Sequence, residues 1–251
     1  NPNDFEKINK IINKRDISII EDNCESMGAI YEGKKTGTIG LIGTFSCFFS
    51  HHISTMEGGM ICTDDEELFQ IMTSIRAHGW TRDLKNSNLL CTKGTNDFDE
   101  SFRFILPGYN LRPIEFSGAI GIEQLKKLQD FIKQRRKNHQ CFKNIFQSDP
   151  RFIIQKEIGS SSWFGFSIII NKNFKIDRTI ILKKLKKANI DYRPIVSGNF
   201  TKSESLKYYD YEIFKSVNNA NYIDKKGFFI GNHHYDLEKN IEYLYETLKN
   251  I

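Results

Sequence analysis

The stretch Phe5–Asp22, FEKINKIINKRDISIIED, decides the fold class. Apolar residues recur at helical spacing over residues 5–14, and the apolar run Ile17–Ile20 then ends at the acidic pair Glu21-Asp22. A helix followed by a short buried strand is the repeating unit of a parallel α/β sheet. We therefore expect an α/β fold in which Asp22 lies at the carboxyl end of a strand, where such sheets bind ligands.

Periodicity predicts further elements downstream. The predicted strands are Thr44–Phe49, Met60–Thr63, Trp163–Ile170 and Ile190–Pro194, and the predicted helices are a capped helix that begins at Asp64, a long helix over residues 114–146, a helix over residues 177–188 and two helices near the end. Residues 80–112 are predicted to be irregular. Strands and helices mix after residue 151, so we expect a large α/β domain over residues 1–147, including the long helix, and a small α+β domain over residues 148–251.

Composition excludes several classes of function. The net charge of +5 is spread along the chain, and its densest run, residues 183–187, lies within a predicted helix, so we expect no nucleic-acid partner. No apolar run approaches the roughly 18 residues that cross a bilayer, so we expect no membrane partner. The five cysteines include no Cys-x-x-Cys pair, so we expect neither a disulfide framework nor a metal or iron–sulfur site, and a cytoplasmic location fits best.

Four short features carry groups that suit chemistry: Asp22, the pair Ser46 and His51, the turn Glu57–Gly59 and the loop Pro107–Pro113. The residues of the first three also have simpler interpretations. Asp22 also suits a helix cap, and Ser46 a hydrogen-bonded strand hydroxyl. His51 stands five residues after Ser46 and also suits a structural histidine. Gly58-Gly59 also suits a hairpin turn. Pro107–Pro113 supplies a rigid loop that includes Asn110.

Taken together, these features resemble the DegT/DnrJ/EryC1/StrS sugar aminotransferases. The motifs that carry the resemblance are Glu21-Asp22, Gly37–Gly40, Gly43–Ser46, Glu57–Gly59, Arg76–Gly79 and Gly108–Arg112. The resemblance covers nearly the whole chain. It implies fold type I of the pyridoxal-phosphate (PLP) enzymes, which is aspartate aminotransferase-like, with a partial large domain and a small C-terminal domain.

One departure from the aminotransferase pattern changes the expected reaction. Aminotransferases of this family hold the cofactor on a lysine five residues after the serine, and that position is His51 here. Imidazole cannot replace the amine of that lysine, but it can move a proton near neutral pH. The exchange resembles the branch of nucleotide-sugar 3-dehydratases. The resemblance therefore implies removal of the C3 hydroxyl from a nucleotide-linked 4-keto-6-deoxyhexose, expected to be GDP-4-keto-6-deoxymannose, in dideoxysugar and O-antigen biosynthesis.

The resemblance also implies a role for each candidate residue. His51 is expected to be the catalytic base, and His52 is the weaker candidate because of its spacing from Ser46. Asp22 is expected to pair with the ring nitrogen of PLP or pyridoxamine phosphate (PMP), and Ser46 to bind the cofactor phosphate. Asn110 is expected to reach the phosphate in a neighbouring subunit, which implies a homodimer. L-Glutamate is the expected amino donor.

Two alternatives remain open at this point. An ordinary sugar aminotransferase would need a lysine at the cofactor, but Lys34, Lys35 and Lys85 stand at the wrong spacing. A non-catalytic protein derived from the family would have only a binding role. The second alternative has support because family members carry a substantial segment before the position of Asn1. We therefore expect that this chain alone lacks part of the large domain and depends on dimerisation or on a longer protein.

Overall fold

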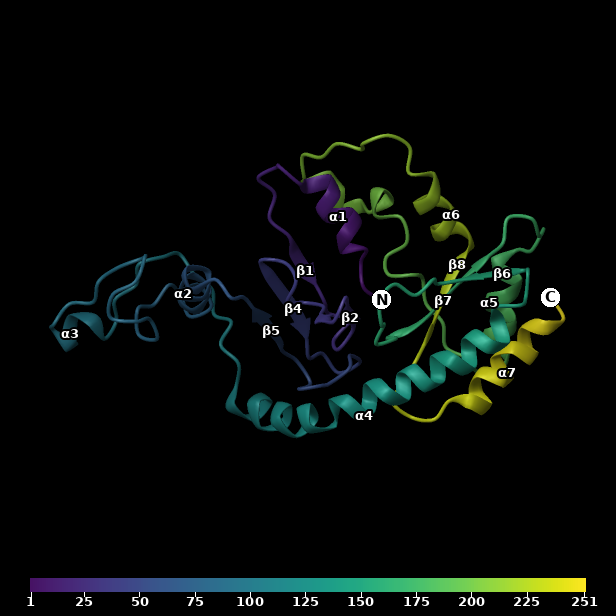
Figure 1. Ribbon diagram of the computed structural model, residues 1–251, viewed down its shortest axis with the longest axis horizontal. Helices are drawn as coiled ribbons and strands as arrows, with labels where there is room; N and C mark the ends of the chain where they lie inside the picture. The colour runs from purple at the N-terminus through teal and green to yellow at the C-terminus, as the bar shows by residue number, and fades with distance from the viewer. The chain divides into compact units, whose positions relative to one another are not determined.

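The computed structural model describes residues 1–251, which form two compact units. The N-terminal unit comprises Pro2–Leu128, and the C-terminal unit comprises Gln129–Ile251 together with Asn1. Asn1 belongs to the second unit because its side-chain amide bonds to the backbone of Lys156 and Ile158. The division falls within helix α4 (Glu115–Phe146), so one continuous helix supplies residues to both units (Figure 1).

The N-terminal unit is built on a three-stranded mixed sheet with the order β1-β4-β5. The bounds of its strands and of the small antiparallel pair beside them are β1 (Ile20–Asp22), β4 (Ile42–Ser46), β5 (Gly59–Cys62), β2 (Ile30–Tyr31) and β3 (Lys34–Lys35). Strand β1 runs parallel to β4 with Asp22 opposite Thr44, and β4 runs antiparallel to β5 with Ser46 opposite Gly59. The α/β organisation predicted from Phe5–Asp22 is therefore present.

The first helix forms as its sequence predicts, but the strand after it differs. Helix α1 (Phe5–Ile12) is capped by Asp4, whose carboxylate accepts the amide of Lys7, and its buried Phe5 packs edge-on against Tyr31. Strand β1 begins only at Ile20, whose side chain is 65% exposed. The prediction of a buried strand over residues 17–20 was wrong, because only one face of this strand, at Glu21, is covered.

The segment between the sheet and α4 is irregular over most of residues 80–112, as predicted. It contains helix α2 (Glu66–Ile75) and the single-turn helix α3 (Asp97–Glu100). The cap of α2 is Asp65, whose carboxylate accepts the amide of Leu68, and not the predicted Asp64. Both residues are Asp, so the sequence offered two caps one position apart, and the structure selects the second.

Helix α4 confirms the predicted long helix. From Leu128 onward a buried side chain recurs every three or four residues, which is the period of an α-helix with one face in a core. The buried positions are Leu128, Ile132, Arg135, Asn138, His139, Phe142 and Phe146. The earlier part of α4 is largely exposed.

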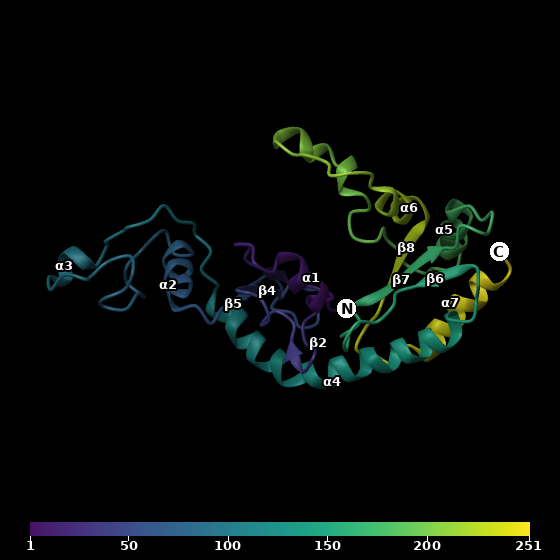
Figure 2. The same ribbon diagram turned by 45° about the horizontal axis from the view of Figure 1, so that its top comes forward.

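The C-terminal unit is an antiparallel sheet with helices, in agreement with the α+β pattern. Its elements are β6 (Phe152–Ile154), β7 (Gly165–Ile170), α5 (Arg178–Lys187), the 3₁₀ turns η1 (Phe200–Lys202) and η2 (Glu204–Tyr208), α6 (Asn218–Lys226), β8 (Gly227–Gly231) and α7 (Glu238–Lys249). The strand order is β6-β7-β8. Helix α7 lies beside the last turns of α4 (Figures 1 and 2), where Tyr245 contacts Phe146 edge-on.

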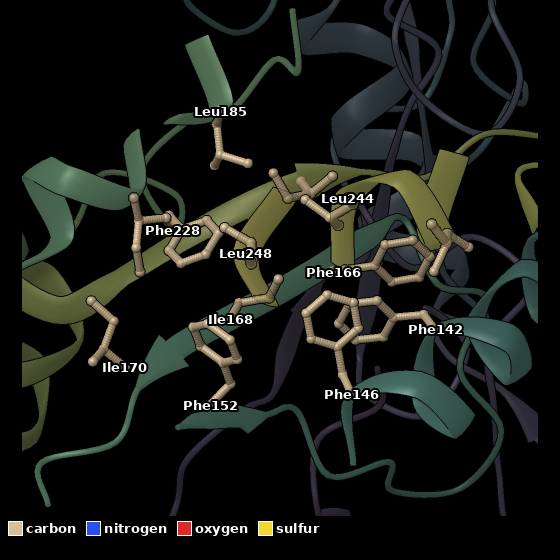
Figure 3. Packing of buried hydrophobic residues seen from close by; sticks show 13 residues of the cluster. Phe142, Phe146, Phe152, Phe166, Ile168, Ile170, Leu185, Phe228, Leu244 and Leu248 are labelled. Atoms are coloured by element: carbon tan, nitrogen blue, oxygen red, sulfur yellow. The ribbon is translucent and has the colours of Figure 1, made fainter. Parts of the chain in front are cut away.

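A dense hydrophobic core fills this unit. Phenylalanines from α4, β6, β7 and β8 pack with aliphatic residues of α5 and α7, and the Phe142 and Phe166 rings stack 4.3 Å apart (Figure 3). The predicted strand Ile190–Pro194 was wrong, because only Arg193 forms an isolated bridge, to Phe229 on β8. No helix of the chain is both long enough and apolar enough to cross a bilayer.

Candidate active site

Asp22 and Ser46 lie at the same edge of the N-terminal sheet. Strands β1 and β4 are parallel, so their carboxyl ends meet there, and each of the two residues is the last of its strand. The Asp22 side chain is exposed, and its carboxylate accepts the amide of Cys24 at 3.2 Å. Asp22 is therefore a turn residue that presents a carboxylate at this edge, and not a helix cap.

His51 is brought to Ser46 by the turn that follows β4. Ser46 Oγ lies 3.4 Å from His51 Nδ1, and the same oxygen accepts the Phe48 amide at 3.2 Å. The His51 amide donates to the Phe48 carbonyl, and the two rings meet edge-on at 6.0 Å. With Nδ1 directed at the serine, Nε2 is the nitrogen that faces away from it.

The two adjacent histidines differ in exposure. His51 is half-buried, whereas His52 is only 1% exposed. A base must reach a substrate proton within hydrogen-bond distance, so the more accessible imidazole, that of His51, is the better placed of the two. Exposure in the structure and spacing from Ser46 in the sequence thus favour the same residue, His51, as the base.

Backbone packing fixes the loop that carries His51. The Cys47 amide donates to Gly58 and the Thr55 amide donates to Cys47, while Thr55 Oγ1 donates to the Glu57 carbonyl at 2.7 Å. A side chain at Gly59 would place its Cβ 2.8 Å from the Phe45 carbonyl oxygen. Gly59 is therefore required for close approach of β5 to β4, and the loop is not the tight two-residue hairpin considered from the sequence.

Glu21 is a site residue that sequence reasoning missed. Its carboxylate is 7% exposed and accepts three backbone amides, from Gly37 at 2.7 Å and from Ile39 and Gly40 at 2.6 Å each. These bonds hold the chain between β3 and β4 against β1. The available signal was a carboxylate on the covered face of a strand, followed by the glycine-rich run Gly37–Gly43.

Cys24 was also missed. Its thiol lies close to the Asp22 carboxylate and to Thr44, and burial, followed by the hydrogen bond to Asp22, raises its pKa to about 11. The thiol therefore stays protonated at neutral pH and can donate to Asp22.

Asn110 is positioned by a different part of the N-terminal unit. It forms a bridge with Ala77, and the Tyr109 carbonyl accepts the His78 amide at 2.8 Å. A Cβ on Gly79 would lie 1.7 Å from the Leu106 carbonyl oxygen, so the two segments touch backbone to backbone. The structure thus brings Asp22, Ser46 and His51 to the β1–β4 edge and holds the exposed Asn110 on the segment that follows α2.

The lysines considered for an aminotransferase lie elsewhere in the N-terminal unit. Lys34 and Lys35 form β3 and are exposed, and Lys85 pairs with Glu66 on α2 at 2.8 Å. The side chain directed at Ser46 is the imidazole of His51 and not a lysine amine.

The fold is that of the fold-type I, aspartate aminotransferase-like class, as the family match and the similar solved structures indicate. The model of the DegT/DnrJ/EryC1/StrS aminotransferase family matches residues 1–248. The chain belongs to this family.

Similar proteins within the family are 3-dehydratases. The chain is 57% identical to GDP-4-keto-6-deoxy-D-mannose 3-dehydratase of Yersinia pseudotuberculosis over 99% of its own length and 64% of the relative's. Two solved structures of GDP-4-keto-6-deoxymannose 3-dehydratase superpose with TM-scores of 0.97 at 55% identity. Each is covered over 65% of its length and covers 99% of this chain. One is a histidine-to-asparagine variant with bound GDP-perosamine, and the other holds a trapped PLP-glutamate geminal diamine. The chain therefore spans less than two thirds of these relatives.

Proposed function

We propose that this chain carries the reaction centre of a PLP/PMP-dependent nucleotide-sugar 3-dehydratase. Its expected substrate is GDP-4-keto-6-deoxymannose, deoxygenated at C3 on the way to a dideoxysugar. The observation that carries the proposal is the His51 imidazole, 3.4 Å from Ser46 Oγ, at the position where aminotransferases of this family have their lysine. Similarity to 3-dehydratases over 99% of the chain supports it.

The residues at the β1–β4 edge would hold the cofactor. The exposed Asp22 carboxylate would pair with its ring nitrogen and keep that nitrogen protonated, and the Ser46 hydroxyl would donate to its phosphate. When bound as PMP, the cofactor supplies an amine that condenses with the C4 ketone of the sugar and a ring that takes up electrons. Residues 1–147 would form part of the large cofactor domain, and residues 148–251 the small domain.

His51 would move the proton that the deoxygenation requires. Its Nε2 faces away from Ser46 and would accept the proton whose loss accompanies departure of the C3 hydroxyl. Ser46 Oγ would keep the imidazole in this orientation. Because no lysine stands at this position, the amine would not be kept on the sugar but released as ammonia. L-Glutamate would then restore the amine, leaving 2-oxoglutarate, so one oxygen passes in net terms from the sugar to the amino donor.

The partner proposals rest on the relatives and on Asn110. A bound GDP-sugar and a PLP-glutamate adduct in the similar structures support a GDP-linked substrate and glutamate as the donor. Asn110 is exposed and is held on the segment after α2. It would reach the cofactor phosphate of a neighbouring subunit, in a homodimer.

The test is mass spectrometry of the sugar after incubation of the chain with PLP, L-glutamate and GDP-4-keto-6-deoxymannose. The expected product has lost the C3 oxygen, with one 2-oxoglutarate formed per sugar. His51→Asn should lower this rate by about 10²-fold or more, because a general base contributes about that much, with cofactor absorbance on the protein unchanged. His52→Asn is the matched control at the neighbouring position.

Two results would contradict the proposal. A 4-amino sugar would indicate an aminotransferase, and reductive trapping with borohydride would then locate its lysine. Full activity of His51→Asn would show that His51 is not the catalytic base.

A further inference from the structure

Helix α5 and the residues around it carry the excess positive charge of the chain. Residues 171–189 contain six lysines, one arginine and one aspartate, which gives a net charge of +6. The whole chain has 36 Lys and Arg against 31 Asp and Glu, a net charge of +5, so all its other residues together carry −1. Basic residues occur along the chain, but acidic residues balance them outside this region. We call the six lysines the lysine face: Lys172, Lys175, Lys183, Lys184, Lys186 and Lys187.

The lysine face is open to solvent and is not neutralised by its own region. Five of its six lysines are exposed, and no salt bridge of the chain includes any of the six. Lys184 donates to the backbone carbonyl of Asn250 at 2.8 Å. The one carboxylate of the region, that of Asp177, caps α5 by accepting the amide of Thr179 at 2.9 Å.

The carboxylates of the neighbouring helix α7 are engaged elsewhere. Helix α7 packs with α5 in the hydrophobic core. Its residues Glu238 and Glu242 line a hollow together with residues of α4. Glu246 pairs with Lys249 of the same helix at 3.0 Å. The lysine face therefore keeps its full charge.

Helical spacing gathers much of this charge on one side of α5. Lys183 and Lys187 follow the exposed Ile180 at three and seven residues, which is the spacing of a single helix face. On the opposite side, Ile181 and Leu185 are fully buried in the core. Because the apolar side of α5 is already covered, a partner can bind the lysine face only through charge and through Ile180, whose side chain is 51% exposed.

Helix stability explains only part of the charge. The lysines in the last turn of α5 lie at the negative end of the helix dipole and stabilise the helix. Lys172 and Lys175, however, precede the positive end, where a cation is unfavourable. Lys183 also stands three and four residues before Lys186 and Lys187, and like charges at these spacings destabilise a helix. The charge of the lysine face as a whole therefore indicates a binding role.

The chemistry of this region suits anionic lipid better than nucleic acid. Lysine is a point charge that is attracted diffusely to anionic headgroups, whereas arginine is preferred where phosphate is bound in bidentate geometry. The one arginine of the region, Arg178, donates to the backbone carbonyls of Asp224 and Gly227. None of the exposed residues of the region is aromatic, so no ring is offered for base stacking. The exposed Ile180 adds an apolar contact that a lipid surface can cover.

We propose that the lysine face is a peripheral docking surface for a membrane that contains anionic phospholipid. The lysines would lie against the headgroups, with Ile180 among them. Helix α5 would lie on the bilayer without crossing it. This contact revises the expectation of no membrane partner, which rested only on the absence of a spanning apolar run. It needs neither cofactor nor sugar, so it stands apart from the reaction proposed above.

Co-sedimentation with vesicles tests this surface directly. We expect the full chain to bind vesicles of phosphatidylcholine and phosphatidylglycerol in equal parts, but not vesicles of phosphatidylcholine alone. Binding should fall as salt rises from about 0.1 M to about 1 M, because the Debye length shortens from about 10 Å to about 3 Å. The triple variant Lys183→Gln, Lys186→Gln and Lys187→Gln should bind the mixed vesicles about 10²-fold more weakly, since each lysine near a membrane surface contributes about fivefold.

Two further variants make the result specific to the lysine face. The control triple variant Lys126→Gln, Lys127→Gln and Lys133→Gln removes the same charge from exposed lysines of α4 and should leave vesicle binding nearly unchanged. The double variant Lys172→Gln and Lys175→Gln lies outside α5, so its effect does not depend on the integrity of that helix. It should weaken binding about 20-fold.

Ile180→Ser separates lipid from other polyanions. It should weaken binding to the mixed vesicles about threefold, because an aliphatic side chain gains free energy when it leaves water, but it should not change binding to soluble polyglutamate. Equal binding to the two kinds of vesicle, or equal binding by the two triple variants, would overturn the proposal. Tighter binding of polyglutamate or of a single-stranded oligonucleotide than of the mixed vesicles would overturn it in favour of an acidic macromolecule.

Discussion

Each of the two units of this chain is stabilised internally by a different kind of interaction. In the C-terminal unit, 13 hydrophobic residues form one buried cluster around β7 and β8. In the N-terminal unit, the strands of the sheet leave apolar side chains exposed, including Ile20 at 65% and Ile61 at 57%. Beside a few apolar contacts such as that of Phe5 with Tyr31, its sheet and loops are fixed by polar or backbone contacts, such as the Glu21 carboxylate on three amides and a Gly43 whose Cβ would lie 1.9 Å from the Gly37 oxygen.

The difference shows that one chain can place its large hydrophobic core in one unit and its candidate reactive residues in the other. Hydrophobic burial gives a free energy that grows with area and depends little on direction. Hydrogen bonds to a fixed carboxylate add less net free energy but restrict both the distance and the direction between the bonded atoms. The unit that carries Asp22, Ser46 and His51 depends on the second kind of interaction.

The largest expected effect tests the hydrophobic core. Phe146→Ala removes a fully buried ring that packs on Phe142 and Tyr245. We expect a loss of about 4 kcal/mol in the free energy of unfolding of the C-terminal unit, measured with denaturant. Ile153→Ala, at a half-exposed position on the same sheet, is the matched control and should cost less than about 1 kcal/mol. Equal costs would mean that burial does not distinguish the two sites.

The next effect tests the polar support of the N-terminal unit. Glu21→Ala leaves the buried amides of Gly37, Ile39 and Gly40 without their acceptor and should cost about 3 kcal/mol. Glu21→Gln keeps one oxygen for the amides of Ile39 and Gly40 and should cost less. Hydrogen exchange at these three amides is the measurement. Unchanged protection in Glu21→Ala would show that the glycine contacts alone hold the loop.

A smaller effect depends on pH. His139 stacks on Trp163 with centroids 3.3 Å apart. Its pKa is lowered from 6.5 to about 4, chiefly by burial; the nearby Glu157 opposes this shift and Lys143 adds to it. Between these values the unfolded chain binds a proton that the folded chain does not, so stability falls as pH falls through this window. From pH 7 to 5 we expect a loss of about 2 kcal/mol from this group. His139→Phe should flatten this slope, and an unchanged slope would assign the effect to other residues.

Much of the fold could be predicted because its signals are local. The helical period of residues 114–146 and the apolar run that becomes β7 each indicated the right element. Errors arose where tertiary contacts decide. Residues 190–194 have strand composition, yet only Arg193 pairs, because β8 takes the position beside β7. The exposure of Ile20 likewise depends on what covers the sheet.

The candidate site was predictable in part for the same reason. The spacing of Ser46 and His51 placed them together because a single turn joins them. Glu21 was missed because its partners lie 16 to 19 residues away and are backbone amides, which leave no side-chain pattern. The stacking of Phe102 and Phe104 on Trp80 was missed because these rings meet only after the chain reverses direction.

Helix α4 has a consequence for motion along the chain. Its first turns are largely exposed and contain Gly118 and Gly121, whereas its last turns lie in the hydrophobic core. Glycine and exposure both lower the free energy needed to open a helical turn. Opening should therefore begin at Glu115 and stop near Leu128. The amide hydrogens at the first end of the helix would then exchange through frequent local opening. Those at the other end would exchange only when the C-terminal unit unfolds as a whole.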